Sequence, residues 1–275
     1  MRKIIFCWAF VLLSVATAWA QDTIRVLAIG NSFSEDAVEN YLYELGREDG
    51  IVFIIGNLYI GGCSLERHWN NATDNKADYA YRKVDAKGVK TTTNRVSLQQ
   101  GIGDEKWDYI SLQQVSGNSG QIESYFPYLT DLKAYVKGLC TNYKVVFLFH
   151  QTWAYAKNST HADFPKYNSS QTDMYNAIVN ASRKATKRAG IRRIIPSGTA
   201  IQNGRGSFFG DNFCRDGYHL SLGLGRYTVA CTWFEYLTGH SVVGNRFVPS
   251  TVSPAEAFVA QRAAHRAVQR PYRTT

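Results

Sequence analysis

The sequence lacks several patterns that are typical of common functional classes. It has no CxxC pair and no clustering of His with Cys, which argues against a structural zinc site. It also has no internal repeat, no low-complexity tract and no Pro/Ser-rich linker, so one large domain is favoured over several small ones. After the N-terminal segment, no stretch is long and apolar enough to cross a membrane.

The N-terminal segment itself has the pattern of a secretory signal peptide. A basic start (Arg2-Lys3) precedes an almost wholly apolar run over residues 4–15, and Ala18-Trp19-Ala20 supplies small residues for cleavage. The apolar run is shorter than the ~20 residues of a membrane span. We therefore expect residues 1–20 to be removed and residues 21–275 to form a single exported domain, periplasmic or secreted.

The charge of the chain indicates no nucleic-acid site. The formal net charge is +9, and loss of the signal peptide would lower it by two. The basic residues are scattered apart from small groups in residues 184–193, which are typical of a solvated helix face. An acidic polysaccharide is a milder inference from this charge, and no obligate protein partner is evident.

Cysteine is scarce in the expected mature chain. Four cysteines could form disulfides outside the cytoplasm, and four allow three pairings among which the sequence does not choose. These are Cys63, Cys140, Cys214 and Cys231.

Apolar runs and amphipathic stretches alternate along the chain. The first apolar run ends at Gly30, and helical periodicity follows from Ser34, which is a good N-cap residue. This alternation predicts an α/β fold, with a mainly parallel five-stranded sheet between two layers of helices. The predicted strands are residues 23–29, 51–55, 107–112, 144–149 and 191–195, and the later helices are residues 125–139, 172–189, 224–237 and 254–268. The polar segment 66–94 is predicted to be an inserted hairpin or loop near the active face.

Polar and glycine residues follow the predicted strands, where ligands bind in open α/β sheets. The positions are Ser32, Gly61-Gly62, Gln113-Gln114, residues 150–153 and residues 197–199. This gathering favours an enzyme.

A candidate nucleophile and base lie at opposite ends of the chain. Ser32 stands in Gly-Asn-Ser-Phe-Ser, which is not the GxSxG elbow of α/β-hydrolases. Asp216 precedes His219 by three residues, so its carboxylate could fold back onto Nδ1 and leave Nε2 to face a serine. Each motif alone is more often structural: Asp216 would cap a helix, and the serine would lie in a turn.

Together, in this order, these motifs resemble the SGNH hydrolases, also called GDSL-like esterases. The matching features are Gly30-Asn31-Ser32, Gly61-Gly62 and Asp216-x-x-His219. The segments YIGGCSLERHW and HQTWAY are similar to those of a bacterial exported subgroup of unassigned function. The resemblance implies a flavodoxin-like sheet, with Ser32 as nucleophile, His219 as base and Asp216 as the residue that orients it.

The resemblance is imperfect at two positions. Asn31 replaces the family's Asp, and the third family block, which normally supplies an oxyanion-binding Asn, reads Gln113-Gln114. Gln113 is our first choice for that donor, with Gln114 second and Asn118 third. The backbone N–H groups of Ser32 and Gly62 would complete the oxyanion hole.

These features predict a serine esterase that removes acetyl or similar small acyl groups from carbohydrate through an acyl-enzyme, without cofactor or metal. A glycan-binding protein on a decayed hydrolase scaffold is the alternative. A lipase or thioesterase on the same fold would need a long apolar groove, which the polar segment 66–94 does not suggest. Aromatic residues that could stack on sugar are Trp153 and Tyr155, and also Trp69, Phe208 and Phe209.

Overall fold

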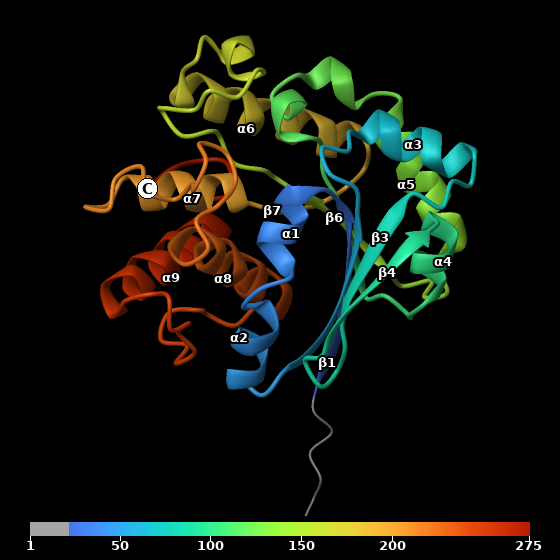
Figure 1. Ribbon diagram of the computed structural model, residues 1–275, viewed down its shortest axis with the longest axis horizontal. Helices are drawn as coiled ribbons and strands as arrows, with labels where there is room; N and C mark the ends of the chain where they lie inside the picture. The colour runs from blue at the N-terminus through green and yellow to red at the C-terminus, as the bar shows by residue number, and fades with distance from the viewer. Residues whose placement is uncertain (1–21) are drawn as a thin grey trace, which may run out of the picture.

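The computed structural model describes residues 22–275, and the predicted signal peptide lies outside them. Seven strands form one sheet in the order β4-β3-β2-β1-β5-β6-β7 (Figure 1). The strands are β1 (Thr23–Gly30), β2 (Val52–Tyr59), β3 (Tyr79–Val84), β4 (Lys90–Val96), β5 (Tyr109–Leu112), β6 (Val146–His150) and β7 (Arg193–Ile195).

The five predicted strands correspond to β1, β2, β5, β6 and β7, and all pairings among these five are parallel. Their carboxyl ends therefore meet at one edge of the sheet. The two further strands come from the polar segment 66–94, in which α3 is followed by an antiparallel hairpin that pairs β3 with β2. The hairpin widens the sheet beyond the five strands predicted.

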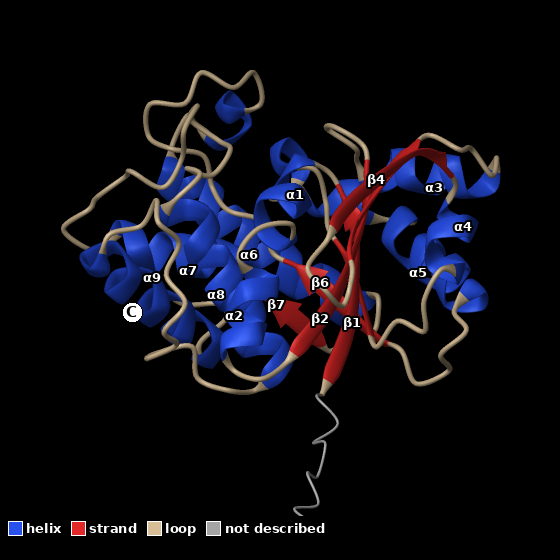
Figure 2. Ribbon diagram, turned by 60° about the horizontal axis from the view of Figure 1, so that its bottom comes forward, coloured by secondary structure: helices blue, strands red, loops and turns tan. Residues whose placement is uncertain are grey.

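Helices cover both faces of the sheet, as predicted (Figure 2). Successive residues of β1 point to opposite faces: Val26 and Ala28 belong to one buried cluster, and Leu27 and Ile29 to the other. The helices are α1 (Ser32–Val38), α2 (Leu42–Glu48), α3 (Leu65–Thr73), α4 (Leu98–Gly103), α5 (Tyr128–Leu139), α6 (Gln171–Arg188), α7 (Ser197–Arg205), α8 (Leu224–Thr238) and α9 (Pro254–Gln269).

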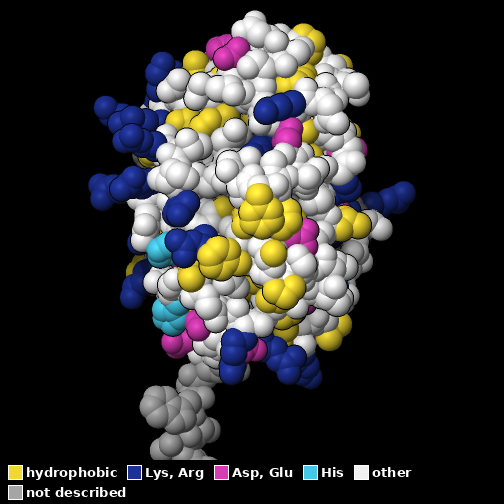
Figure 3. Space-filling model, turned by 90° about the vertical axis from the view of Figure 1, so that its left-hand side faces the viewer, with side chains coloured by type: hydrophobic (Ala, Val, Ile, Leu, Met, Phe, Trp, Pro, Cys, Tyr) yellow, Lys and Arg dark blue, Asp and Glu magenta, His cyan; other side chains and the backbone are white. Residues whose placement is uncertain are grey.

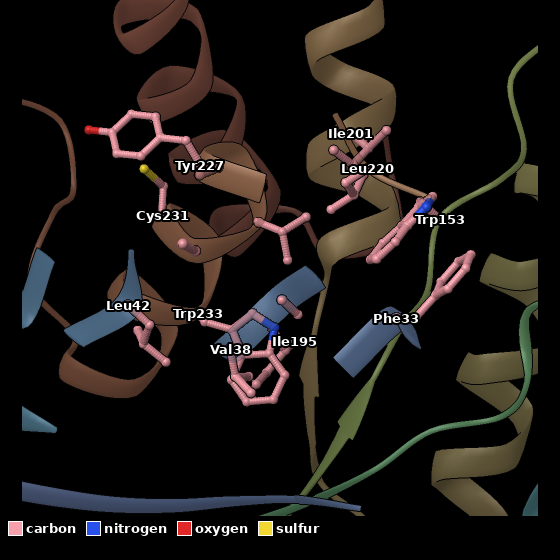
Figure 4. Close-up of a cluster of buried hydrophobic side chains, with 14 of the residues drawn as sticks. Phe33, Val38, Leu42, Trp153, Ile195, Ile201, Leu220, Tyr227, Cys231 and Trp233 are labelled. Atoms are coloured by element: carbon pink, nitrogen blue, oxygen red, sulfur yellow. The ribbon is translucent and has the colours of Figure 1, made fainter. Parts of the chain in front are cut away.

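The cluster on the α1 side joins the N-terminal and C-terminal parts of the chain. Figure 4 shows Val38 and Leu42 lying near Trp233 of α8, with Phe33 beside Trp153. These side chains are fully or almost fully buried. The packing fixes α1, which follows β1 directly, against α8.

The single helix predicted from Ser34 is instead two short helices, α1 and α2. The chain breaks at Tyr41, whose φ of 68° is left-handed. The Tyr41 hydroxyl donates to the carbonyl of Leu222 at 2.7 Å, so a tertiary contact accompanies the break. The local apolar periodicity spans the break and therefore does not reveal it.

Two further expectations concern the whole chain. Between residues 22 and 275 the four cysteines are unpaired, and Cys63 and Cys231 are buried. None of the helices in the same range combines the length and apolar character that a membrane span requires.

On the face shown in Figure 3, Lys and Arg side chains are scattered among apolar and uncharged ones.

Candidate active site

Ser32 is the first residue of α1, immediately after β1. Asn31 is the N-cap: its Oδ1 accepts a hydrogen bond from the backbone N–H of Phe33 at 3.0 Å, while Nδ2 donates to the carbonyl of Cys63 at 3.0 Å. The prediction of Ser34 as N-cap is therefore wrong, because the N-cap lies three residues earlier. Ser34 is buried, and its hydroxyl bonds to the Asn31 carbonyl and to Asn57 Oδ1.

The far end of the chain brings His219 to Ser32. His219 Nε2 lies 2.9 Å from Ser32 Oγ, and His219 Nδ1 lies 2.7 Å from Asp216 Oδ2. The other carboxylate oxygen, Oδ1, accepts the backbone N–H groups of Tyr218 and His219. The Asp-x-x-His segment thus closes into a tight turn around the carboxylate.

The protonation states of Asp216 and His219 follow from their hydrogen bonds. Partial burial alone would raise the pKa of Asp216, but the hydrogen bonds from the His219 ring and from the two backbone N–H groups outweigh it and lower that pKa. An ionised Asp216 can only accept, so His219 carries its proton on Nδ1. His219 Nε2 is then the acceptor for the Ser32 hydroxyl.

A buried carboxylate on α1 holds this turn in place. Asp36 is fully buried, and its oxygens accept the backbone N–H of Leu220 and hydrogen bonds from Arg215 and Arg226. Trp153 adds a second support, because its Nε1 donates to the carbonyl of Tyr218 at 2.7 Å. Sequence reasoning missed Asp36, whose only signal was its place as an acidic residue near the start of the helix that follows β1.

The predicted sugar-stacking role of Trp153 and Tyr155 is wrong. Both side chains are completely buried. The Trp153 ring stacks on Phe33 with centroids 4.1 Å apart, and the Tyr155 hydroxyl bonds to that of Ser116 at 2.9 Å. Their rings complete the core beneath the site, and no face is open to a ligand.

The turn after β2 presents Gly62 beside the nucleophile. Gly62 has a φ of 62°, and a Cβ built there would meet nothing within 4 Å, so the turn is open on this side. The Asn31–Cys63 hydrogen bond ties this turn to the residue before Ser32. Within residues 22–275, neither the Ser32 N–H nor the Gly62 N–H has a hydrogen-bond acceptor. These two backbone groups are free to bind an oxyanion.

Two of the three side chains considered as the third oxyanion donor, those of Gln113 and Gln114, are engaged elsewhere through their amide N–H groups. Gln113 is buried and donates from Nε2 to Asn31 Oδ1 at 2.9 Å. Gln114 is also buried; it donates to Ser124 and accepts the backbone N–H of Leu65. Asn118 Oδ1 accepts from Lys166. This geometry corrects the assignment of Gln113, because its polar atoms are used in fixing the residue that caps α1.

Gln113 belongs to a buried hydrogen-bond chain along the carboxyl ends of the parallel strands. Gln113 Oε1 lies 2.9 Å from His150 Nδ1, and His150 Nε2 lies 3.0 Å from Ser197 Oγ. With Asn31 and the Cys63 carbonyl, the chain joins the ends of all five parallel strands behind Ser32. The sequence assigned no role to His150, although its place at the end of a predicted strand was a signal.

Two backbone groups determine which atoms donate and which accept along this hydrogen-bond chain. The Phe33 N–H and the Cys63 carbonyl orient the Asn31 amide, so Gln113 must donate to Asn31 Oδ1 and accept with Oε1. His150 therefore donates from Nδ1, and its Nε2 accepts from Ser197. Burial lowers the pKa of His150 to about 3, in agreement with a neutral ring.

The site is open to solvent and is built without metal ligands. The Asp216 side chain is 42% exposed and that of His219 is 18% exposed. Across residues 22–275, no three His, Cys, Asp or Glu side chains form a group that could hold a metal ion. The arrangement can activate a serine hydroxyl at the surface, where a bulky ester can reach it.

Comparisons with known proteins agree with this architecture. The family model of DUF4886, a domain of unknown function, matches residues 25–267. A crystal structure of a DUF4886 family protein from Bacteroides uniformis is 53% identical with a TM-score of 0.91, covering 92% of this chain and 98% of that one. A comparison with curated proteins found no match.

More distant structures share the fold. One is described as a candidate SGNH hydrolase from Slackia heliotrinireducens, at 20% identity and a TM-score of 0.53, covering 78% of this chain and 99% of that one. Another is a variant of an acetyl-xylooligosaccharide esterase from Geobacillus, at 11% identity and a TM-score of 0.52, covering 84% and 100%. The expected fold class is thus confirmed as that of the SGNH-type hydrolases.

Proposed function

The chain belongs to the DUF4886 family, and we propose that it is an exported serine esterase that removes acetyl or similar small acyl groups from carbohydrate. One observation carries the proposal: the continuous hydrogen bonds from Ser32 through His219 to Asp216. A hydroxyl bonded to an imidazole that is itself oriented by a carboxylate is the arrangement that serine hydrolases use. The hydrolase-type fold of the chain is in keeping with it.

In the proposed mechanism, Ser32 Oγ attacks the ester carbonyl while His219 Nε2 takes its proton. Asp216 keeps the Nδ1–H tautomer and stabilises the imidazolium that forms. The backbone N–H groups of Ser32 and Gly62 bind the developing oxyanion. His219 then protonates the departing alcohol, and a water molecule, deprotonated by His219, releases the acid from Ser32.

The choice of a small acyl group on carbohydrate rests on the shape and chemistry around Ser32. Asp216 of the triad is well exposed, and the segments 61–62, 78 and 94–95 at the same edge of the sheet are exposed and carry no large apolar side chain. A lipase or thioesterase would need an apolar groove for its acyl chain. The acetyl-xylooligosaccharide activity named for the Geobacillus structure is one example of such a substrate on this fold.

Two assays test the proposal directly. The mature protein should hydrolyse 4-nitrophenyl acetate and release acetate from at least one acetylated polysaccharide. A fluorophosphonate should label Ser32, as located by peptide mass spectrometry. If acetylated glycans bind without any ester hydrolysis or labelling, the decayed glycan-binding scaffold is the better description.

Export is a separate part of the proposal and rests on the N-terminal sequence alone. Mass spectrometry of the protein recovered outside the cytoplasm should find a chain that begins near Gln21. An intact chain that starts at Met1 and stays inside the cell would overturn it.

A further inference from the structure

A hollow of about 450 Å³ lies beside the turn that carries Gly62. It is lined by Tyr59 at the end of β2 and Gly61 in the turn after it, by Asp78 just before β3, and by Asn94 and Arg95 of β4. β2 is the neighbour of β1, and β4 is the third strand from β1. With strands about 4.8 Å apart, the hollow extends from roughly 5 to 14 Å from the end of β1, which leads into Ser32.

Three polar side chains of this hollow, those of Asp78, Asn94 and Arg95, form no hydrogen bond or ion pair within residues 22–275. Arg95 and Asp78 are exposed, and neither side chain forms a hydrogen bond or ion pair with any residue of 22–275. The Asn94 side chain is equally free over that range. A guanidinium donates, a carboxylate accepts, and an amide does both. Opposite charges in one hollow do not select an ion; they suit a ligand whose many hydroxyl groups donate and accept.

The backbone at Arg95 is adapted to present its side chain. Arg95 has a φ of 57°, a left-handed conformation that is unfavourable for a residue with a Cβ. It lies where the β3–β4 pairing shifts register opposite Tyr79 and Tyr81. A shift of this kind re-aims a side chain and is common beside active sites.

Contacts of Arg82 link the hollow to the helix that carries Ser32. The Arg82 guanidinium lies 3.8 Å from the centre of the Tyr59 ring. Arg82 also pairs at 3.0 Å with Glu35, which stands one turn after Ser32 in α1. The hairpin and the helix that carries Ser32 are therefore joined across one side of the site.

We propose that this hollow is a subsite for a sugar unit of the acylated glycan, with Arg95, Asp78 and Asn94 binding its hydroxyl groups. The inference rests on the proposed esterase function, and it assigns glycan recognition to the hairpin of residues 79–96. A small acetyl ester reaches Ser32 without occupying the hollow. Recognition of the glycan and chemistry on the ester can thus be separated by mutation.

The test compares Arg95→Gly with Arg192→Ala, an exposed arginine near the start of β7. Glycine removes the side chain and accepts the left-handed φ, so the melting temperature should not fall. The substrates are 4-nitrophenyl acetate and acetylated oligosaccharides from xylan, mannan and chitin. On the best oligosaccharide, Arg95→Gly should raise KM about tenfold, the effect of losing a charge-assisted hydrogen bond, with kcat nearly unchanged.

The small ester should be hydrolysed equally by wild type, Arg95→Gly and Arg192→Ala. An unchanged KM for the oligosaccharide in Arg95→Gly would overturn the subsite, as would hydrolysis of the small ester with no oligosaccharide accepted. If no ester is hydrolysed, the proposed function fails, and calorimetric titration of the same oligosaccharides into wild type and Arg95→Gly still decides the subsite. Weaker binding to the variant supports it, and equal or absent binding to both refutes it.

Discussion

Asp36 accepts a hydrogen bond from the backbone N–H of Leu220 at 2.8 Å. The first residue lies one turn after Ser32, and the second follows His219 directly. The helix that carries the candidate nucleophile therefore also holds the turn that carries the candidate base. This contact spans 184 positions in the sequence, and it turns two distant motifs into one site.

Asp36→Asn should damage both stability and turnover. Asp36 is fully buried and is the shared counter-ion of Arg215 and Arg226, whose side chains are partly exposed, so its neutralisation weakens both ion pairs at a buried position. We expect a loss of about 3 kcal/mol in the free energy of unfolding. Release of Leu220 would also let His219 move from Ser32 and lower kcat. Urea unfolding and ester kinetics measure the two effects, and the exposed Asp74→Asn is the control, for which neither should change.

Asp216→Asn should disturb the tautomer of His219 without disturbing the fold. An amide can donate to His219 Nδ1 and so favour the wrong tautomer, which leaves a proton on Nε2 facing Ser32. We expect kcat to fall by roughly 10³–10⁴. The side chain is 42% exposed, so the melting temperature should change little. Turnover close to that of wild type would make Asp216 a turn residue only.

Gly62→Ala tests the backbone donor in the turn after β2. Gly62 has a φ of 62°, so alanine costs about 1 kcal/mol and displaces the N–H that would face the oxyanion. We expect kcat to fall about 10²-fold with little change in KM. Gly50→Ala is a matched control, because Gly50 has a φ of 78° with open surroundings and lies at the opposite end of β2. Equal kcat values in the two variants would remove Gly62 from the oxyanion hole.

The sequence predicts most of the fold because its signals are local. Each parallel strand is a short apolar run, and Gly30 and Asn31 mark the end of β1 plainly. The predicted Ser32, Asp216 and His219 are brought together, but the resemblance to a family was needed to connect them. The rest depends on contacts that no local pattern encodes. The helix break at Tyr41 is accompanied by a contact with Leu222, and Trp153 is stacked on Phe33 of α1, 120 positions away in the sequence.

Gln113 is the clearest case of a residue whose position was predictable and whose role was not. Gln113→Ala should remove one of the two donors to Asn31 Oδ1, where the Phe33 N–H remains, and should leave His150 Nδ1 without its acceptor in a buried site. We expect a loss of about 2–4 kcal/mol in the free energy of unfolding, together with reduced kcat. A true oxyanion donor would instead lower kcat at constant stability. Thermal melts and kinetics on one soluble ester distinguish the two, and an unchanged melting temperature would restore the oxyanion role.

The buried hydrogen-bond chain that contains His150 should also make the free energy of unfolding fall as the pH falls. Burial lowers the pKa of His150 to about 3, whereas the imidazole in the unfolded chain has its ordinary value of about 6.5. Between these values the unfolded chain binds a proton that the folded chain does not. The contribution of His150 to stability is therefore fully present above about pH 6.5 and is lost as pH falls towards 3, by at most about 1.4 kcal/mol per pH unit.

His150→Gln removes this titration, so the variant should lose less stability than wild type when pH falls from about 6.5 to 4.5. The exposed His240→Gln is the control and should retain the wild-type loss attributed to His150. His68, buried with its pKa also lowered to about 3, titrates in the same window in all three proteins, so only the difference between them is informative. Urea unfolding at several pH values measures it. Parallel curves for wild type and His150→Gln would mean that the imidazole takes up its proton inside the folded protein, and the directed chain from Ser197 to Asn31 would then be wrong.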